Sequence, residues 1–169
     1  MMIEVSKTTE GGCTCGHVRY QILAKPLIVH CCHCRWCQRQ TGSAFAINAL
    51  VEARNVKLVS GDVEELMVDS PSGNGQNIVR CSICRVAVWS HYYMSGLKER
   101  IRFIRVGTLD NPDLMPPEVH IYTSTKQPWV LLANGANAVE LFYDYDEIWS
   151  PESLDRRAAL MEDAGIPVS

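Results

Sequence analysis

The eight cysteines constrain this chain more than any other feature, because their spacing limits what they can bind. Neighbours two or three residues apart are awkward disulfide partners but suitable co-ligands of one metal ion. Disulfides also belong to oxidising compartments, and the first ten residues have neither the basic start nor the apolar core of an export signal. The pattern therefore favours metal binding by three groups of cysteines: Cys13 and Cys15, Cys31, Cys32, Cys34 and Cys37, and Cys81 and Cys84.

Two of these groups are pairs, and each pair supplies only half of the four ligands that a closed metal site requires. Structural zinc sites take four ligands in a closed tetrahedron. The Cys81-x-x-Cys84 spacing is typical of a zinc knuckle, and Cys13 and Cys15 can converge if the chain bends between them. We therefore predict a structural zinc site of four thiolates that ties the N-terminal turn to the middle of the chain.

The remaining cluster predicts a second zinc site of a different kind. Cys32, Cys34 and Cys37 can surround one ion and leave its fourth position to water or substrate, as catalytic zinc sites do. Cys31 is the alternative fourth ligand, but adjacent residues of an extended chain point to opposite sides. We expect up to two zinc ions, the second in an open site.

Length and charge limit the number of domains and the classes of partner that this chain can have. A chain of 169 residues suggests one domain, and its formal charge of −3 argues against nucleic acid as a partner. No apolar run reaches the roughly 18 residues of a membrane-spanning helix. We therefore expect a cytoplasmic protein that does not bind membranes, whereas the sequence leaves the oligomeric state open.

Short alternating segments predict a mainly β fold. Val18, Tyr20 and Ile22 share one face of the first such segment, and similar segments recur along the chain. Residues 35–41 read as a short helical turn that Gly42 ends. Near the end, Ser150 followed by proline and glutamate predicts a helix start. We expect a zinc-binding β domain at residues 1–149 and a helical extension packed on it at residues 150–169.

The ordered motifs GGCTCGHVRY, CHCRWCQRQTGSAF, CSIC and PEVHI, with a later Trp129, resemble the glutathione-dependent formaldehyde-activating family, which includes relatives of centromere protein V. The resemblance runs from about Gly11 to Trp129. It implies a β-tent of short antiparallel strands stapled by zinc. It also implies a structural zinc on the two cysteine pairs and a reactive zinc on the cluster. The ligands so implied are Cys13, Cys15, Cys81 and Cys84 for the first ion, and Cys32, Cys34 and Cys37 for the second.

Two positions depart from the family pattern. Arg80 stands where an aromatic residue is usual before the second CxxC motif, and Arg85 stands where glycine is usual after it. An arginine in that place requires a strained backbone or a different turn. Fold and metal binding are therefore expected to transfer better than the substrate.

The family reaction joins glutathione reversibly to formaldehyde, so the resemblance implies a zinc-dependent carbon–sulfur lyase acting on a small thiol and an aldehyde. Arg35 and Arg39 flank the open cluster and can attract a carboxylate of the thiol peptide, although arginines on a helix surface are common. The alternative is a zinc-stapled protein-interaction module without turnover. Such a module is expected to close the second site with Cys31 or another group.

Other residues have plainer expected roles. His33, between two predicted ligands, either holds a thiolate or carbonyl or lies on the surface. His120 is expected to be a structural histidine. The tryptophans Trp36, Trp89 and Trp129 are expected in the core or in a pocket wall.

Overall fold

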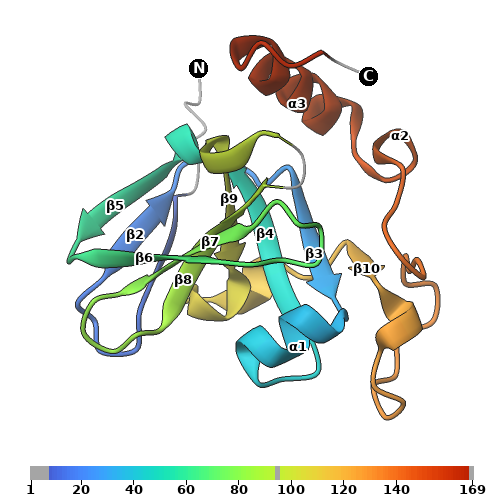
Figure 1. Ribbon diagram of the computed structural model, residues 1–169, viewed down its shortest axis with the longest axis horizontal. Coiled ribbons are helices and arrows are strands. Elements are labelled where there is room, and N and C mark those ends of the chain that lie inside the picture. The colour runs from blue at the N-terminus through green and yellow to red at the C-terminus, as the bar shows by residue number, and fades with distance from the viewer. Residues whose placement is uncertain (1–7, 94–95, 168–169) are drawn as a thin grey trace, which may run out of the picture.

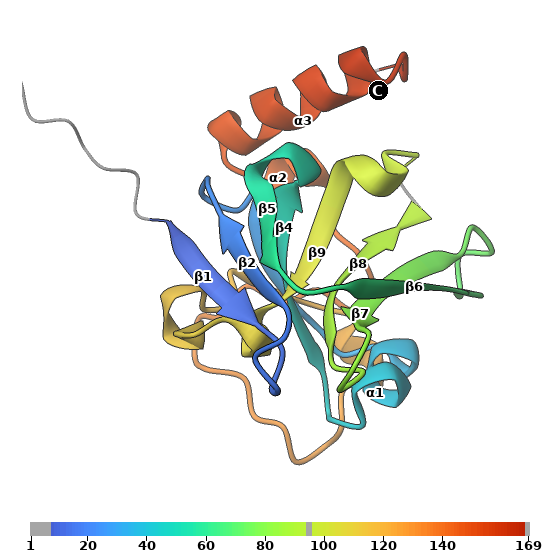
Figure 2. The same ribbon diagram turned by 90° about the vertical axis from the view of Figure 1, so that its left-hand side faces the viewer.

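A computed structural model describes residues 8–93 and 96–167, which form two β-sheets and a C-terminal helical segment (Figure 1). The small sheet has the order β1-β2-β5, and the large one has the order β10-β3-β4-β9-β8-β7-β6. Figure 2 shows β1 and β2 on one side and β6, β7 and β8 on the other. The strands are β1 Thr9–Gly12, β2 Arg19–Ile22, β3 Ile28–Cys32, β4 Ala46–Glu52, β5 Val56–Ser60, β6 Val63–Val68, β7 Gln76–Cys81, β8 Ala87–Tyr92, β9 Ile101–Arg105 and β10 Val119–Ile121.

The mainly β prediction is confirmed, with one difference in strand pairing. Neighbouring strands run antiparallel except β3 and β10, which are parallel. A parallel pair needs a long connection, and here the chain passes through six other strands before β10 returns beside β3. The sequence pattern carries no signal of so distant a pairing.

The first hairpin shows how local pattern sets the buried face. Val18, Tyr20 and Ile22 are at most 1% exposed, so the predicted face of this segment is correct. Gly11 and Gly12 are the last two residues of β1, directly before the turn that carries Cys13 and Cys15. A Cβ on Gly12 would lie 2.3 Å from the carbonyl oxygen of Val18, so only glycine permits this close pairing.

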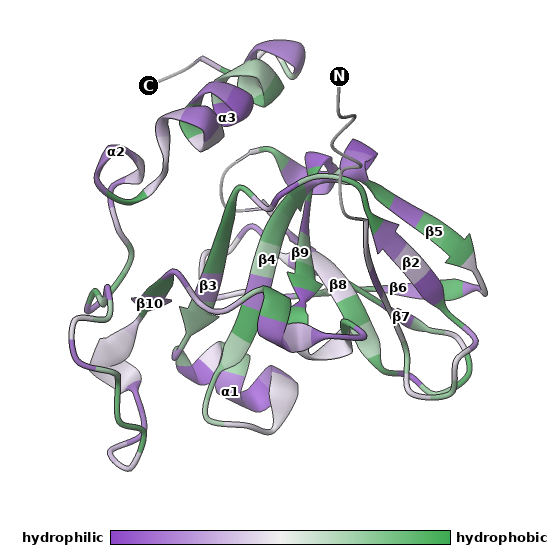
Figure 3. Cartoon of the chain, turned by 180° about the vertical axis from the view of Figure 1, so that it is seen from behind, coloured by the Kyte–Doolittle hydropathy of each residue, from purple (hydrophilic) through white to green (hydrophobic). Residues whose placement is uncertain are grey.

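The middle strands of the large sheet have a hydrophobic core on each face. On β4, Ala49 and Val51 pack into one core, whereas Leu50 packs into the other. On β9, Ile104 and Ile101 divide in the same way. Figure 3 shows the resulting hydrophobic character along β3 and β4. This explains why alternation alone did not show which face of β9 is buried.

The helices are short except for the last. Gly42 ends α1 with a φ of 64°, so the predicted helical turn and its end are confirmed. Within residues 8–93 and 96–167, the α-helices are α1 Arg35–Thr41, α2 Tyr145–Ile148 and α3 Pro151–Asp163, and the 3₁₀ turns include η1 Ala53–Asn55, η3 Lys98–Arg100, η4 Val106–Thr108, η5 Pro112–Leu114 and η6 Thr123–Thr125. Among the described residues, none of these helices combines the length and apolar character needed to cross a membrane.

The C-terminal helix begins as the sequence predicts. The Ser150 hydroxyl accepts a hydrogen bond from the backbone N–H of Ser153, and the Ser153 hydroxyl donates to the carbonyl of Leu27 at 2.7 Å. Leu160 and Met161 are buried in the second core. The division of the chain into two units at residue 150 stays a prediction.

An ion pair links α3 to the end of β4. Arg156 donates from Nε and Nη2 to the two carboxylate oxygens of Glu52 at 2.7 and 2.6 Å, and the Glu52 side chain is 1% exposed. Burial is the largest single influence and raises the pKa of Glu52, but the hydrogen bonds from Arg156, a backbone N–H and Asn55, together with the charge of Arg156, outweigh it, so the net shift is downward. The stabilisation is therefore complete above the ordinary pKa of 4.5 and is lost as the pH falls through the folded pKa.

We expect Arg156→Met to lower the free energy of unfolding at pH 7 by about 3 kcal/mol, because it leaves a buried carboxylate unpaired. Urea unfolding measures the loss, which should shrink at acidic pH. Arg54→Met is the matched control, since Arg54 and Asp163 lie 4.0 Å apart and are 62% and 66% exposed. That pair should contribute about 0.5 kcal/mol or less. Equal losses in the two variants would contradict the prediction.

Candidate metal centres

The first candidate centre is the four-cysteine group, Cys13, Cys15, Cys81 and Cys84, whose sulfur atoms all lie within 4.8 Å of one another. The sulfurs of Cys13 and Cys15 are 3.4 Å apart, and those of Cys15 and Cys81 are 3.8 Å apart. Zinc–thiolate bonds of about 2.3 Å in a tetrahedron place sulfurs roughly 3.8 Å apart. The donor set and its spacing therefore fit zinc.

Backbone N–H groups donate hydrogen bonds to sulfur atoms of this group. Val18 donates its N–H to the sulfur of Cys13 at 3.2 Å, and Ile83 donates to the sulfur of Cys81 at 3.4 Å. The backbone N–H of Val86 lowers the pKa of Cys84 to about 6. Because metal ligands must be deprotonated, these contacts prepare the group to bind a cation.

The two arginines that depart from the family pattern converge on one carboxylate. Arg85 has a φ of 66°, so an arginine occupies the left-handed conformation in which glycine is usual, as predicted. Its guanidinium pairs with Glu64 on β6, and Arg80 lies 3.6 Å from the same carboxylate. Hydrogen bonds from Arg85 lower the pKa of Glu64. This ion-pair cluster holds the strained turn beside the four-cysteine group.

The second candidate centre is the three-cysteine group, Cys32, Cys34 and Cys37, at the junction of β3 and α1. Cys34 caps α1, and its sulfur accepts a hydrogen bond from the backbone N–H of Cys37 at 3.3 Å. Hydrogen bonds from Cys32 and Cys37 lower the pKa of Cys34 to about 3. The hydrogen bond to the Cys34 sulfur in turn raises the pKa of Cys32, which acts as the donor. The group thus favours one thiolate held by two thiols, an arrangement that a divalent cation can convert into three ligands.

Cys31 points away from this group. Its sulfur lies 3.5 Å from His33 Nε2, and His33 Nε2 lies 2.9 Å from His120 Nδ1, so these residues form a separate cluster in which Cys31 and His33 are buried and His120 is half-buried. His33 is fully buried, so the surface alternative for it is wrong. Its carbonyl accepts hydrogen bonds from Gln38 and Thr125, which fix the start of α1. Cys31, the alternative fourth ligand, is therefore directed away from the three-cysteine group.

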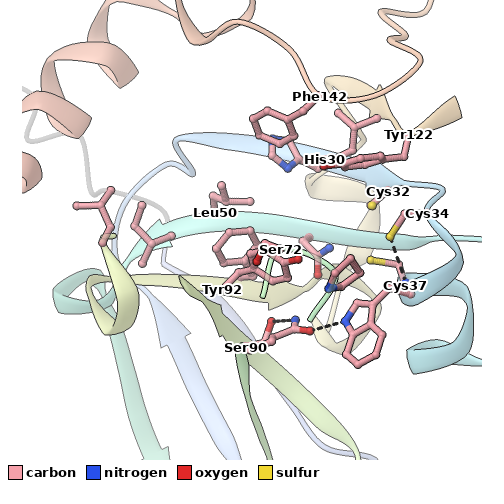
Figure 4. Close-up of a pocket in the computed structure, with 18 of the residues that line it drawn as sticks. His30, Cys32, Cys34, Cys37, Leu50, Ser72, Ser90, Tyr92, Tyr122 and Phe142 are labelled. Carbon is pink, nitrogen blue, oxygen red and sulfur yellow. Dashed lines mark hydrogen bonds between the residues drawn. The ribbon is translucent and has the colours of Figure 1, made fainter. Parts of the chain in front are cut away.

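A cavity of about 380 Å³ opens beside the three-cysteine group. In Figure 4, the three cysteines lie at one end, Phe142 and Tyr122 lie along one side and Tyr92 lies opposite. Arg105 lines the same space and donates to the side-chain oxygen of Asn48 at 2.8 Å. The walls are rich in aromatic residues: Trp36, Tyr92, Phe103, Tyr122, Phe142, Tyr145 and Trp149.

The model of the family described as glutathione-dependent formaldehyde-activating enzyme matches residues 8–125, a segment that contains all eight cysteines. The chain belongs to this family. A crystal structure of a Rhodobacter sphaeroides protein is similar with a TM-score of 0.45 and 19% identity, covering 64% of this chain and 96% of that one. The chain matches no protein of curated function.

Within the family segment, the structure separates residues that the sequence placed together. Arg35 and Arg39 line a second, shallower cavity on the other side of α1, with Trp129, and not the cavity beside the cysteines. Their contact with a thiol peptide stays a prediction. Trp129 is 70% exposed and lies in the wall of this second cavity rather than in the core, Trp89 is buried, and Trp36 lines the cavity beside the cysteines, each within the predicted alternatives.

Most residues of the cavity wall carry no signal in the sequence, and Arg105, Tyr122 and His30 are the ones among them with unusual charge, conformation or burial. Arg105 is a charged residue within an alternating strand, and Tyr122 follows the PEVHI motif with a φ of 56°, a strained conformation that often marks a functional site. His30 is buried, and burial lowers its pKa to about 3, so the ring is neutral at pH 7. The one available signal was an arginine at the end of the alternating segment IRFIR, and Arg102 in the same segment makes that signal weak.

Proposed function

We propose that this member of the glutathione-dependent formaldehyde-activating family is a zinc-dependent enzyme that adds a small thiol to an aldehyde and cleaves the adduct in reverse, as a carbon–sulfur lyase. The observation that carries the proposal is the three-cysteine group at the end of a cavity, with Cys31 directed elsewhere. Three protein ligands leave one position for a reactant, which is the arrangement of a catalytic zinc site.

The reaction needs no oxidant or reductant. The thiol sulfur attacks the carbonyl carbon and forms a C–S bond, while the C=O π electrons move to oxygen, which takes up the proton that the thiol gives up. When bound, zinc supplies the positive charge that keeps an incoming thiol in its thiolate form. Cys32, Cys34 and Cys37 hold that charge at one end of the cavity and so orient the attacking sulfur toward the aldehyde.

Arg105 is the proposed partner of the developing oxyanion. Three thiolates and one Zn²⁺ carry a net charge of about −1, which weakens the pull on a carbonyl oxygen. Burial lowers the pKa of Arg105, and negative charge on Cys37 and Cys32 opposes this, with a net shift downward; a guanidinium nevertheless stays protonated at neutral pH. The guanidinium offsets the excess charge, and in a site sheltered from water it stabilises negative charge on the substrate oxygen.

The four-cysteine group is proposed to hold a second zinc ion with a structural role. It lies on turns after β1 and β7, one from each sheet, so a closed site there joins the two sheets. A reducing compartment such as the cytoplasm suits a protein with eight unpaired thiols and a thiol substrate.

The experiment compares the exchange between glutathione, formaldehyde and their adduct in four solutions: zinc-loaded protein, metal-stripped protein, free zinc and buffer. Exchange NMR suits the test, because the background addition is fast. We expect the zinc-loaded protein alone to raise the rate, by about tenfold or more, through positioning of the thiolate. If no small thiol binds in calorimetry and zinc loading leaves the rate unchanged, the interaction module without turnover becomes the better interpretation.

A further inference from the structure

The cavity beside the three-cysteine group is much larger than formaldehyde requires. A water molecule takes up about 30 Å³ in the liquid, and a formaldehyde unit is only slightly larger. The cavity measures about 380 Å³, which is within the usual range for sites that bind drug-sized ligands. Once the sulfur and the carbonyl are placed at the cysteines, most of this space is left for another part of a reactant.

The walls indicate what that part is. Leu50, Leu97, Ile101 and Phe103 contribute hydrocarbon surface beyond the cysteines. The polar side chains of the lining largely bond to one another. Trp36 donates to Gln76 at 2.9 Å, and Gln76 donates to Ser90 at 2.9 Å. A ligand in this space therefore meets mostly apolar surface.

These walls fit the polar ends of a thiol peptide poorly. Each carboxylate moved from water into such a space needs its own charged or hydrogen-bonding partner. Of the two lining arginines, Arg105 bonds to Asn48 and is the one that the proposed reaction uses for the substrate oxygen, and Arg157 lies over the ring of Tyr145 at 4.1 Å from its centroid. No lysine and no carboxylate lines the described cavity. The thiol peptide is thus better placed toward solvent, and the interior is left for the aldehyde.

One wall of the cavity is built by a part of the chain beyond the matched family segment. Phe142, Tyr145, Trp149 and Arg157 all follow residue 125, where the family match ends. Hydrogen bonds hold this wall in place, because Trp149 Nε1 donates to the Tyr143 hydroxyl at 2.6 Å and that hydroxyl also bonds to His30. The aromatic wall is therefore preformed and supplied by this chain's own C-terminal segment.

We propose that the C-terminal wall makes the cavity a binding site for the apolar substituent of an aldehyde larger than formaldehyde, so that aryl and alkyl aldehydes are the preferred substrates. The inference rests on the proposed function for its reaction. The same C–S bond forms and the same proton moves to oxygen, so the product is the thiohemiacetal of the larger aldehyde. The apolar group gains burial and contact with aromatic rings.

The first test compares benzaldehyde, hexanal and formaldehyde as partners of glutathione on the zinc-loaded protein. For each aldehyde, kcat/KM is divided by the uncatalysed second-order rate constant. We expect this ratio to be at least about tenfold higher for benzaldehyde and hexanal, because burial of their apolar groups adds binding that formaldehyde lacks. A ratio for formaldehyde that equals or exceeds theirs would overturn the inference, while leaving the proposed function in place.

The second test needs no turnover. Benzyl alcohol carries the aryl group without a reactive carbonyl, and Trp36 and Trp149 line the cavity, so binding can be followed by tryptophan fluorescence and calorimetry. We expect Phe142→Ala to weaken benzyl alcohol binding about tenfold and Phe142→Leu to weaken it less. Leu141→Ala is the matched control, because Leu141 is 63% exposed and does not line the cavity.

The two tests separate the two proposals. Benzyl alcohol binding that depends on Phe142, without any zinc-dependent rate, would support the apolar site and contradict the proposed reaction. Absence of binding to the native protein would contradict the apolar site, whatever the rate with formaldehyde. Thermal melting of each variant shows whether the wall still folds, and Phe142→Leu keeps the test decisive if the alanine variant does not.

Discussion

Replacing Cys81 by serine is expected to lower the free energy of unfolding by more than about 5 kcal/mol, enough to unfold much of the protein. The zinc affinity of a structural site contributes directly to folding, because the unfolded chain lacks the assembled ligands. Cys81 is fully buried, and its sulfur lies 3.8 Å from that of Cys15, although 66 residues separate the two along the chain. Loss of this ligand removes a link between distant segments.

The measurement is thermal melting by circular dichroism, together with zinc content by elemental analysis. The native protein should carry up to two zinc ions per chain and the Cys81→Ser variant no more than one. Cys34→Ser is the control, because its group spans only residues 32–37 and does not join the sheets. A lower melting temperature for Cys34→Ser than for Cys81→Ser would show that the structural and reactive sites are assigned the wrong way round.

The second large effect concerns activity. Cys34→Ser should abolish the zinc-dependent acceleration of thiol addition, a loss of about tenfold or more, because it removes both a metal ligand and a group that positions the thiolate. The fold and the zinc of the four-cysteine group should remain. The rate is compared with that of metal-stripped protein, since uncatalysed addition sets the lower limit.

Cys31→Ser is the matched control for this prediction. Cys31 belongs to the same strand but contacts His33, and burial raises its pKa to about 12, so it is a neutral thiol. Its replacement should leave the zinc-dependent rate within about twofold of the native value. If Cys31→Ser abolishes the acceleration and Cys34→Ser does not, the reactive group has been chosen wrongly.

The parts of this structure that follow from short-range pattern could be predicted. The spacing of Cys81 and Cys84 fits a turn of the backbone that brings their sulfurs together. Alternation placed Val18, Tyr20 and Ile22 on a buried face, and the Ser150–Pro151 pair marked the start of α3. In each case the physical cause lies within a few residues of the feature.

The cavity depends on distant pairings and could not be predicted in this way. It brings His30 of β3, Tyr92 of β8, Arg105 of β9 and Phe142 of the C-terminal segment to one place. Their meeting follows from the order of strands in the large sheet, which local pattern does not specify. The same limit explains Arg35 and Arg39, whose closeness to the cysteines in sequence did not place them in the same cavity.

The spacing of the ligands along the chain has a consequence for synthesis on the ribosome. The three-cysteine group is complete once residue 37 has emerged, so a nascent chain can present it early. The four-cysteine group waits for Cys84, and until then the hairpin of β1 and β2 has no metal link to the rest of the protein. The aromatic wall from Phe142 to Arg157 emerges last. The ligands of the three-cysteine group are therefore synthesised before the four-cysteine group is complete, and both precede the C-terminal wall that completes the cavity.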